Sequence, residues 1–291
     1  MQQKLIAFIG GGNMAQAIVL GLLKQGYPAD KIIVNDPNEE KRHFFAQYGV
    51  AVSTDNNQSI TQSQVVLFAV KPQVLADVCK PLSAVDFSDK LIISIAAGIS
   101  TARLTELIPT AKSIVRVMPN TPALVGEGMA GLFADKNTPE IDRTFAEDLL
   151  SSVGKTTWVT NEDQMHAVTA ASGSSPAYFF QFLEAMQQGL IEMGLDEKQS
   201  RELVQQAMLG SAKLVSENPQ TALSTLRENV TSKGGTTAAA LNVFNQDITW
   251  PDIHHYRLLK RRKVWYRLCC MIVASKCSNK LIFTIFSKEP I

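Results

Sequence analysis

The glycine-rich stretch near the N-terminus constrains the fold of this chain more than any other feature. Residues 5–9 (LIAFI) are a short apolar run rich in branched side chains, which is typical of a buried parallel strand. Gly10, Gly12 and Ala15 follow with the spacing G-x-G-x-x-A, and helical character resumes at Asn13. A strand, a tight turn and a helix N-terminus in this order form a phosphate-binding unit. The motif therefore predicts a Rossmann-like domain that binds a dinucleotide at this turn.

Composition indicates an ordinary globular protein, and we expect two domains and a cytoplasmic location. The 291 residues are 45% hydrophobic and 19% charged, which allows a large buried core. No run reaches the roughly 18 apolar residues that span a bilayer, so we expect no membrane partner. The first apolar run lacks a signal-peptide pattern. The four cysteines lack the spacing of a zinc site or of a disulfide framework, so we expect reduced thiols and no metal.

Apolar runs alternate with helical stretches up to about residue 160. This alternation predicts a doubly wound α/β sheet, whose ligands bind beyond the carboxyl ends of the strands. Lys71 and the small residues 96–98 follow two of the runs and are expected at that edge. Strands are expected at residues 31–34, 49–52, 65–70, 91–95, 113–118, 128–133 and 155–159.

Two polar residues at the end of the second expected strand bear on the choice of cofactor. An acidic residue there binds the adenosine ribose 2′-OH and favours NAD, whereas a nearby Arg favours NADP. Asp36 is close to the expected position, Asn35 fits it equally well, and Arg42 lies one helical turn further on. An equally good interpretation is that Asp36 or Asn35 caps a helix starting at Pro37. The preference between NADH and NADPH therefore stays open.

Beyond residue 160 the apolar spacing becomes helical. Helices are expected at residues 162–172, 177–193 and 198–214, and Gly194 is expected to close the second. A second glycine-rich stretch, residues 230–241 (VTSKGGTTAAAL), then leads into an alanine-rich helix. Hydroxyl groups and two glycines before a helix N-terminus can form an anion site. An ordinary capped helix start is an equally good interpretation of the same residues.

Five motifs occur in order along most of the chain. They are FIGGGNMA (8–15), AVKPQ (69–73), VRVMPNTPALVGEG (115–128), SGSSPAYF (172–179) and LRENVTSKGGTTAAAL (226–241). In sequence and spacing they resemble the pyrroline-5-carboxylate reductase family. The resemblance implies an N-terminal Rossmann-like domain and an all-α C-terminal domain that forms a homodimer or a higher homo-oligomer. It also implies hydride transfer from NADPH or NADH to the C=N carbon of 1-pyrroline-5-carboxylate, giving L-proline in the last step of proline biosynthesis.

The resemblance also implies which residues contact the ligands. We expect no catalytic side chain, because a pyrroline nitrogen can carry its own proton into the reaction. The family often has Pro where this chain has Lys233, and Gly where it has Ser175, and neither change removes a group that the chemistry needs. Substrate-binding residues are expected to be Ser232, Gly234, Gly235, Thr236 and Thr237, with Glu162 as a looser match. Cofactor-binding residues are expected to be Gly10, Gly11, Gly12, Asn13, Met14, Ala15, Asn35, Asp36, Asn56, Ala69, Val70, Lys71, Pro72, Ala97 and Asn229.

Residues 249–291 differ sharply from the rest of the chain. They hold nine Lys or Arg against two acidic residues, a net charge of +7. Residues 1–248 hold the other 19 basic and 25 acidic residues, a net charge of −6. The resemblance stops at the same point. We therefore expect an NAD(P)-binding domain at 1–160, a helical substrate and dimerisation domain at 161–248, and an atypical basic tail at 249–291.

Two other functions are consistent with parts of the sequence. A hydroxyacid dehydrogenase would share the design of the first 160 residues, but it needs a helix Lys as general acid, and residues 172–180 contain none. A cofactor-binding protein without turnover is supported only by the altered C-terminus. The basic run KRRK (260–263) has no motif context, so we expect no nucleic-acid partner.

Overall fold

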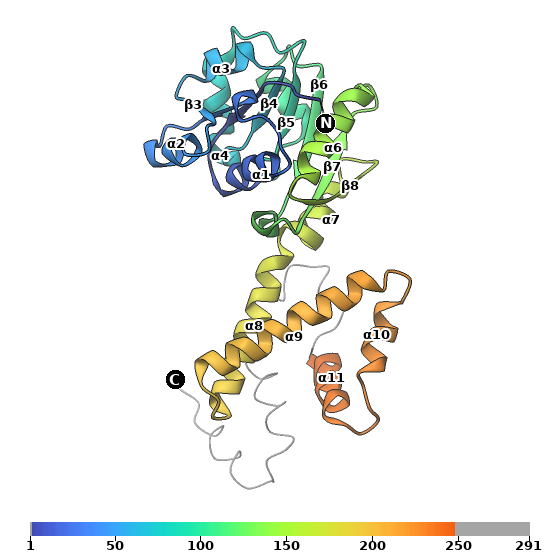
Figure 1. The fold of residues 1–291 in the computed structure, drawn as a ribbon. Coiled ribbons are helices and arrows are strands. Elements are labelled where there is room, and N and C mark those ends of the chain that lie inside the picture. The colour runs from blue at the N-terminus through green and yellow to red at the C-terminus, as the bar shows by residue number, and fades with distance from the viewer. Residues whose placement is uncertain (1, 248–291) are drawn as a thin grey trace, which may run out of the picture. The chain divides into compact units, whose positions relative to one another are not determined.

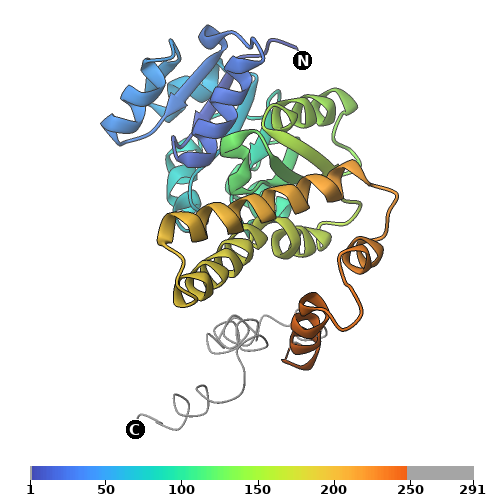
Figure 2. The same ribbon diagram turned by 60° about the horizontal axis from the view of Figure 1, so that its bottom comes forward.

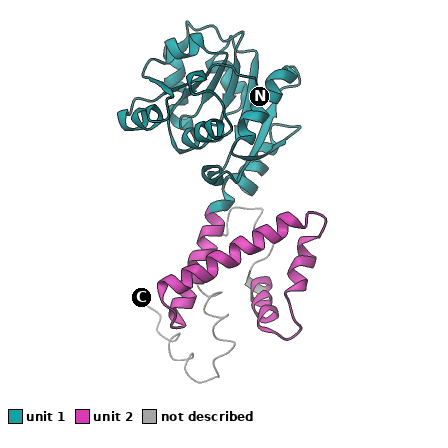
Figure 3. Cartoon of the chain, viewed as in Figure 1, with its two compact units in different colours: residues 1–176 teal, residues 177–291 magenta. Residues whose placement is uncertain are grey.

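A computed structural model of the chain describes residues 2–247. The basic tail predicted at residues 249–291 lies outside the described residues. The chain divides into two compact units, Met1–Pro176 (unit 1) and Ala177–Ile291 (unit 2), as Figure 1 and Figure 3 show. The functional domain boundary predicted at residue 160 stays a prediction.

Unit 1 is built on one sheet of eight strands. In chain order the strands are β1 (Ile6–Ile9), β2 (Ile32–Asn35), β3 (Ala51–Ser53), β4 (Val65–Phe68), β5 (Leu91–Ser94), β6 (Ser113–Met118), β7 (Gly128–Ala134) and β8 (Gly154–Trp158). Their order across the sheet is β3-β2-β1-β4-β5-β6-β7-β8, with every pair parallel except β6 and β7. The chain therefore reverses its direction of winding between β1 and β4, which confirms the predicted doubly wound sheet.

The central strands are apolar because both faces of the sheet are covered. All residues of β1, β2, β4 and β5 are buried. Side chains alternate along a strand, so Ile6 and Phe8 join the core on one face, while Ala7 and Ile9 join the core on the other. Each large apolar side chain buried in this way contributes about 1.5–3 kcal/mol. Continuous apolar runs were thus a sound signal for these strands.

Most helices of unit 1 begin at side-chain caps or at prolines, and α1 and α7 begin without either. Asn38, Asp55 and Ser100 each accept a hydrogen bond from a backbone N–H in the first turn of the helix that they precede. The interpretation in which Asp36 or Asn35 caps a helix at Pro37 is therefore wrong. The helices are α1 (Asn13–Lys24), α2 (Glu39–Ala46), α3 (Asn56–Gln62), α4 (Pro72–Cys79), α5 (Thr101–Leu107), α6 (Glu140–Ser151) and α7 (Gln164–Val168), with short turns η1 (Ala29–Lys31), η2 (Lys80–Leu82) and η3 (Thr121–Val125).

The last segment of unit 1 departs from the sequence-based expectation. One continuous helix was predicted at residues 162–172. Instead α7 covers five residues and gives way to a π-helical turn, η4 (Thr169–Gly173). A π-turn inside a helical segment marks a place where the i→i−4 hydrogen bonds are interrupted.

Unit 2 consists of helices, as predicted. They are α8 (Ser175–Glu192), which begins in unit 1, α9 (Glu197–Glu217), α10 (Leu223–Asn229) and α11 (Thr236–Asp247), coloured yellow to red-orange in Figure 1 and in the turned view of Figure 2. Gly194 lies in the turn between α8 and α9 and has φ +97°, a conformation that glycine adopts without strain. Apolar side chains of this unit stay exposed, among them Phe180 at 64% and Leu223 at 68%. Within residues 2–247, no helix is both long and apolar enough to cross a membrane.

Candidate cofactor and substrate site

The turn after β1 requires glycine at position 10. Gly10 has φ +107°, and a Cβ there would lie 2.8 Å from the carbonyl oxygen of Ala69. The N–H of Gly10 donates to the carbonyl oxygen of Asn35 at 2.8 Å. The chain thus turns tightly between the ends of β2 and β4, where no other residue fits.

The N-terminus of α1 has the properties of a phosphate site. Gly12 is the N-cap residue, and a Cβ at Gly12 would meet no atom within 4 Å. The first turn contains no acidic residue. The backbone N–H groups at Asn13, Met14 and Ala15 belong to the first turn of this 12-residue helix, at its positive end. This loop fits the pyrophosphate of a dinucleotide, as the motif predicts.

Asp36 is turned toward the glycine-rich loop. Its carboxylate accepts hydrogen bonds from the N–H of Gly11 at 2.8 Å and of Asn38 at 2.9 Å, and from Lys41 Nζ at 3.2 Å. Burial alone would raise the pKa of Asp36, but these hydrogen bonds and the Lys41 charge outweigh it and lower the pKa. Arg42 donates to the backbone carbonyl of Asp36 at 2.8 Å. Asp36 is therefore an ionised group held at the loop by two backbone donors and a cation.

Asn35 lies behind this loop and is only 2% exposed. Its Oδ1 accepts a hydrogen bond from Ser59 Oγ at 2.8 Å, and its Nδ2 donates to the carbonyl of Phe8. The amide therefore joins α3 to the β1–β2 pair and does not face solvent. Both residues are buried, Asp36 at 7% exposure, but Asp36 is the one whose side chain contacts the glycine-rich loop, through the N–H of Gly11. Asn56, the first residue of α3, is half-buried.

The loops after β4 and β5 lie at the same edge of the sheet as the glycine-rich turn. Their strands are parallel to β1, and β4 is its direct neighbour. Ala69 and Val70 follow β4, Lys71 is the N-cap residue of α4, and Pro72 is its first residue. Lys71 and Ala97 are exposed. The structure thus brings the predicted cofactor residues of unit 1 to one edge of the sheet, next to the switch point between β1 and β4.

Glu162 is held by two partners within unit 1. Its Oε1 accepts from Arg116 and from the N–H of Thr101, and its Oε2 accepts from Thr101 Oγ1, all at 2.8 Å. Burial alone would raise the pKa of Glu162, but the hydrogen bonds from Arg116 and Thr101 and the Arg116 charge lower it. Both carboxylate oxygens are therefore engaged, and the carboxylate joins the start of α7 to α5 and β6.

Sequence reasoning missed Arg116, although the sequence carries a signal for it. Arg116 is the one charged residue in the strand SIVRVM, and it is 7% exposed. A buried guanidinium needs a partner, so a cation inside an apolar strand predicts an acidic residue nearby. The identity of that partner, Glu162, depends on tertiary structure.

The residues that resemble the family's substrate loop come together in unit 2. Ser232 accepts the N–H of Gly235 at 3.0 Å through its backbone carbonyl, and Gly234 has φ +72°. This tight turn ends at Thr236, the first residue of the 12-residue helix α11. The hydroxyl groups of Ser232, Thr236 and Thr237 are exposed around the helix N-terminus. Asn229 is the last residue of α10.

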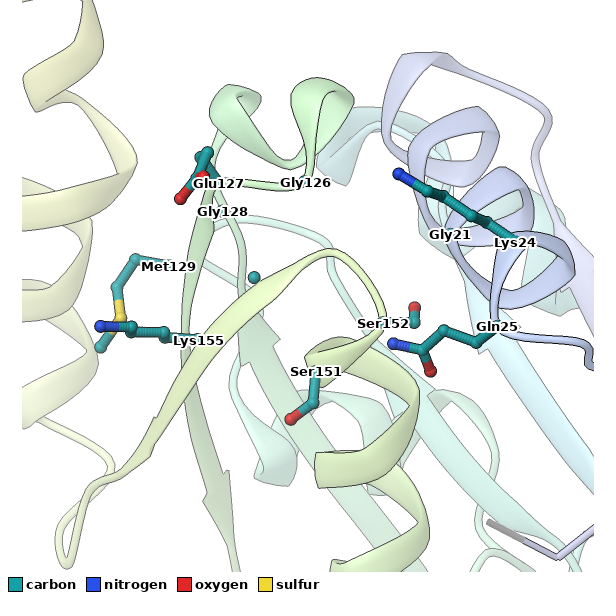
Figure 4. A pocket seen from close by; sticks show the side chains of 11 residues that line it. Gly21, Lys24, Gln25, Gly126, Glu127, Gly128, Met129, Ser151, Ser152 and Lys155 are labelled. Carbon is teal, nitrogen blue, oxygen red and sulfur yellow. The ribbon is translucent and has the colours of Figure 1, made fainter. Parts of the chain in front are cut away.

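A hollow of about 670 Å³ lies on unit 1 away from these residues. Figure 4 shows it between the C-terminal end of α1 and the starts of β7 and β8, with Lys24 and Lys155 on opposite sides. Both lysines are exposed, and none of the predicted cofactor residues lines the hollow. The dinucleotide motif, and not this hollow, therefore locates the site.

The glycine-rich turn at the switch point of a doubly wound sheet defines unit 1 as the NAD(P)-binding domain of an oxidoreductase. Residues 5–98 match the family model "NADP oxidoreductase coenzyme F420-dependent", and residues 162–249 match "Pyrroline-5-carboxylate reductase dimerisation". The chain belongs to the pyrroline-5-carboxylate reductase family, which confirms the sequence resemblance.

Relatives and solved structures agree on this family. A pyrroline-5-carboxylate reductase of Haemophilus influenzae is 77% identical over 245 residues, covering 84% of this chain and 90% of the relative. That of Pasteurella multocida is 62% identical, covering 84% and 91%. The Coxiella burnetii enzyme structure matches with a TM-score of 0.78 at 35% identity, covering 95% of this chain and 100% of that one. The Plasmodium falciparum enzyme with NADP bound matches with a TM-score of 0.76 at 26% identity, covering 94% and 98%.

Proposed function

We propose that this chain reduces 1-pyrroline-5-carboxylate to L-proline with NAD(P)H, the last step of proline biosynthesis. The observation that carries the proposal is the 77% identity to a pyrroline-5-carboxylate reductase over 90% of that enzyme's length. The open helix N-terminus at Gly12 supports it from the structure, because it is a site for the cofactor's pyrophosphate.

The proposed cofactor site comprises the predicted residues of unit 1 together with Asn229. The N–H groups of residues 13–15 bind the pyrophosphate. Asp36, Lys41 and Arg42 lie where the adenosine ribose is expected, and Lys41 and Arg42 are cations that favour a 2′-phosphate. The negative charge of Asp36 disfavours a 2′-phosphate, but Lys41 Nζ at 3.2 Å offsets that charge. We therefore infer that NADH and NADPH are both used, with modest discrimination.

The proposed substrate site is the loop at the start of α11. Ser232 and Thr237 donate hydroxyl hydrogen bonds to the substrate carboxylate, and the backbone N–H groups of Gly234 and Thr236 add to them, while the N–H of Gly235 is used by the Ser232 carbonyl. The positive end of the α11 dipole attracts the same anion. Glu162 also resembles a residue near the substrate, but both its oxygens already accept hydrogen bonds from Arg116 and Thr101. We therefore infer that it supports the site without binding substrate.

The reaction depends on positioning the substrate and the cofactor more than on acid or base groups of the protein. When bound, the reduced nicotinamide supplies the hydride. Hydride transfer requires the C=N carbon within roughly 3–3.5 Å of the reduced nicotinamide, and the loop at residues 232–237 would contribute by holding the substrate carboxylate. The pyrroline nitrogen carries its own proton, so no side chain has to supply one. This is why we assign binding residues and no catalytic acid.

The oligomer we propose is a homodimer formed through unit 2. Among residues 177–245, Val204 is the one large apolar side chain that is fully buried, at 2% exposure. Phe179, Leu203 and Leu209 are among those left exposed, and such apolar helix faces need a partner. A second copy provides it, in line with the dimerisation domain at residues 162–249. We also infer a cytoplasmic location, as the sequence predicts.

Steady-state kinetics test the proposed function. The purified full-length protein should oxidise NADPH and NADH when 1-pyrroline-5-carboxylate is added, and L-proline should accumulate in equal amount. Expression should also restore growth of a proline auxotroph. Faster turnover of a hydroxy acid with NAD⁺ would favour the hydroxyacid-dehydrogenase alternative, and binding without turnover would favour a cofactor-binding protein.

A further inference from the structure

One backbone carbonyl of the π-turn before α8, that of Ser172, lacks the donor that a continuous helix would give it. The N–H of Ser174 donates to the carbonyl of Thr169 at 2.8 Å, a bond that spans five residues. In a continuous α-helix, the carbonyl of Ser172 would accept from the N–H of residue 176. Pro176 has no N–H, and a proline ring also crowds the carbonyl four residues earlier. The Ser172 carbonyl therefore needs a donor from elsewhere.

Asn120 supplies that donor. Its Nδ2 donates to the carbonyl of Ser172 at 3.2 Å, and its Oδ1 accepts from the N–H of Met129 at 2.9 Å. Ser172 Oγ in turn donates to the carbonyl of Met129 at 3.1 Å. Asn120 is 8% exposed, so the two bonds that its side chain forms are partly shielded from water. These three residues, the Asn120 bridge, connect the end of β6 and the start of β7 with the π-turn.

Close packing holds the same segment against the sheet. A Cβ at Gly173 would overlap Met118 Cε, at the end of β6. A Cβ at Gly131, on β7, would lie 2.5 Å from Val168 Cγ1. Glycines at both positions therefore let residues 168–173 lie directly on the β6–β7 pair. The Asn120 bridge then holds the Ser172 carbonyl, which has no helical donor because residue 176 is proline.

We propose that Asn120 is a positioning residue, whose amide fixes the start of α8 by replacing the donor that Pro176 lacks. This inference rests on the proposed function. The helix that starts at Ser175 is the covalent connection to the substrate loop at residues 232–237, while the glycine-rich loop belongs to unit 1. Losing the bridge frees the start of this helix, which leads along the chain to the substrate loop, whereas the glycine-rich loop keeps its own contacts. We therefore expect substrate turnover to fall while cofactor binding does not change.

The first test compares Asn120→Asp with the wild type. Aspartate keeps the size and the acceptor of asparagine but cannot donate to the Ser172 carbonyl. We expect kcat/KM for 1-pyrroline-5-carboxylate to fall about ten- to a hundredfold, as for a reacting group displaced by a fraction of an ångström. The Kd of NADPH, measured by fluorescence titration, should stay within about twofold. The matched control is Asn218→Asp, which removes an exposed amide donor to a helix carbonyl and should leave kcat/KM unchanged.

The second test is a rescue that a general loss of stability does not predict. Pro176→Ala returns an N–H that can donate to Ser172, so adding it to Asn120→Asp should recover most of the lost kcat/KM. The thermal midpoint of each variant is measured in parallel, and Asn120→Ser replaces Asn120→Asp if the latter does not fold. An unchanged kcat/KM in a folded variant, an equal loss of NADPH affinity or an absent rescue would overturn the inference. An inactive wild type would instead reject the proposed function.

Discussion

Removing the Glu162 carboxylate tests how unit 1 is held together at the start of α7. Glu162→Ala deletes three hydrogen bonds at once, two from Thr101 and one from Arg116. It also leaves the Arg116 guanidinium, 7% exposed, without an acidic partner. The variant therefore measures the penalty of an unpaired buried charge as well as the lost bonds.

The expected magnitude follows from the burial of the pair. Truncating one partner of a fully buried ion pair costs about 3–5 kcal/mol. The Glu162 side chain is 22% exposed, so water replaces part of the lost contact, and about 2–4 kcal/mol is expected. For a protein of this size each kcal/mol lowers Tm by about 2–4 °C, which gives a fall of roughly 4–16 °C.

Thermal unfolding of three variants measures this effect. Glu106→Ala is the matched control, because Glu106 forms an exposed ion pair with Arg103 on α5, worth about 0–1 kcal/mol. Glu162→Gln keeps the shape and one acceptor and should be intermediate. A Glu162→Ala midpoint no lower than that of Glu106→Ala would refute the reasoning. A large rise in KM for pyrroline-5-carboxylate with an unchanged midpoint would instead favour direct substrate binding by Glu162.

The same pair predicts a dependence on pH. The pKa of Glu162 is lowered in the folded state: burial opposes this shift, and the hydrogen bonds from Arg116 and Thr101 produce it. A carboxyl with a lowered folded-state pKa stabilises the protein above its unfolded pKa of about 4.3, and this contribution is lost as pH falls through the folded value. The difference in unfolding free energy between wild type and Glu162→Gln should therefore be constant near neutral pH and shrink below about pH 4.

Four further predictions concern the ligand loops and one helix contact. Asp36→Ser should raise the NADPH/NADH ratio of kcat/KM by about tenfold, since it removes a charge and frees Lys41; an unchanged ratio would show that Asp36 does not sense the adenosine. Thr237→Val should lower kcat/KM for the substrate about ten- to a hundredfold without changing cofactor Kd. Gly21→Ala should destabilise by about 1–3 kcal/mol, because its Cβ meets Val153 and lies 2.8 Å from the Ser152 carbonyl. Gly12→Ala, where a Cβ meets no atom within 4 Å, should keep the wild-type Tm and raise KM for NADPH.

Much of unit 1 could be predicted because local signals and tertiary structure agree. Residues 65–68 are apolar on both faces and form a central strand, as expected from a continuous apolar run. The glycine-rich turn at residues 10–12 has the backbone that its spacing requires. The antiparallel direction of β7 was not predicted, because an apolar run carries no information about the direction in which it pairs.

The features that the sequence did not predict have a different cause. In each of them a residue distant in sequence determines the local structure. Asn38 caps α2 because the Asp36 carboxylate is used by the N–H of Gly11. The helix expected at residues 162–172 gives way at Thr169 to the π-turn, where the Ser172 carbonyl accepts a hydrogen bond from Asn120. The partners of Glu162, Arg116 and Thr101, could not be found from spacing because tertiary structure brings them together. Whether Glu162 and the other predicted binding residues contact ligands stays a prediction.

The order of strands in unit 1 has a consequence for synthesis on the ribosome. Strands β2 and β3 extend the sheet from one side of β1, and β4 then pairs with the other side of β1. From there each new strand pairs with the strand made just before it, up to β8. No strand has to be inserted between two strands that are already paired. A chain emerging at about 5–20 residues per second can therefore extend this sheet at its growing edge without breaking any hydrogen-bonded pair already formed.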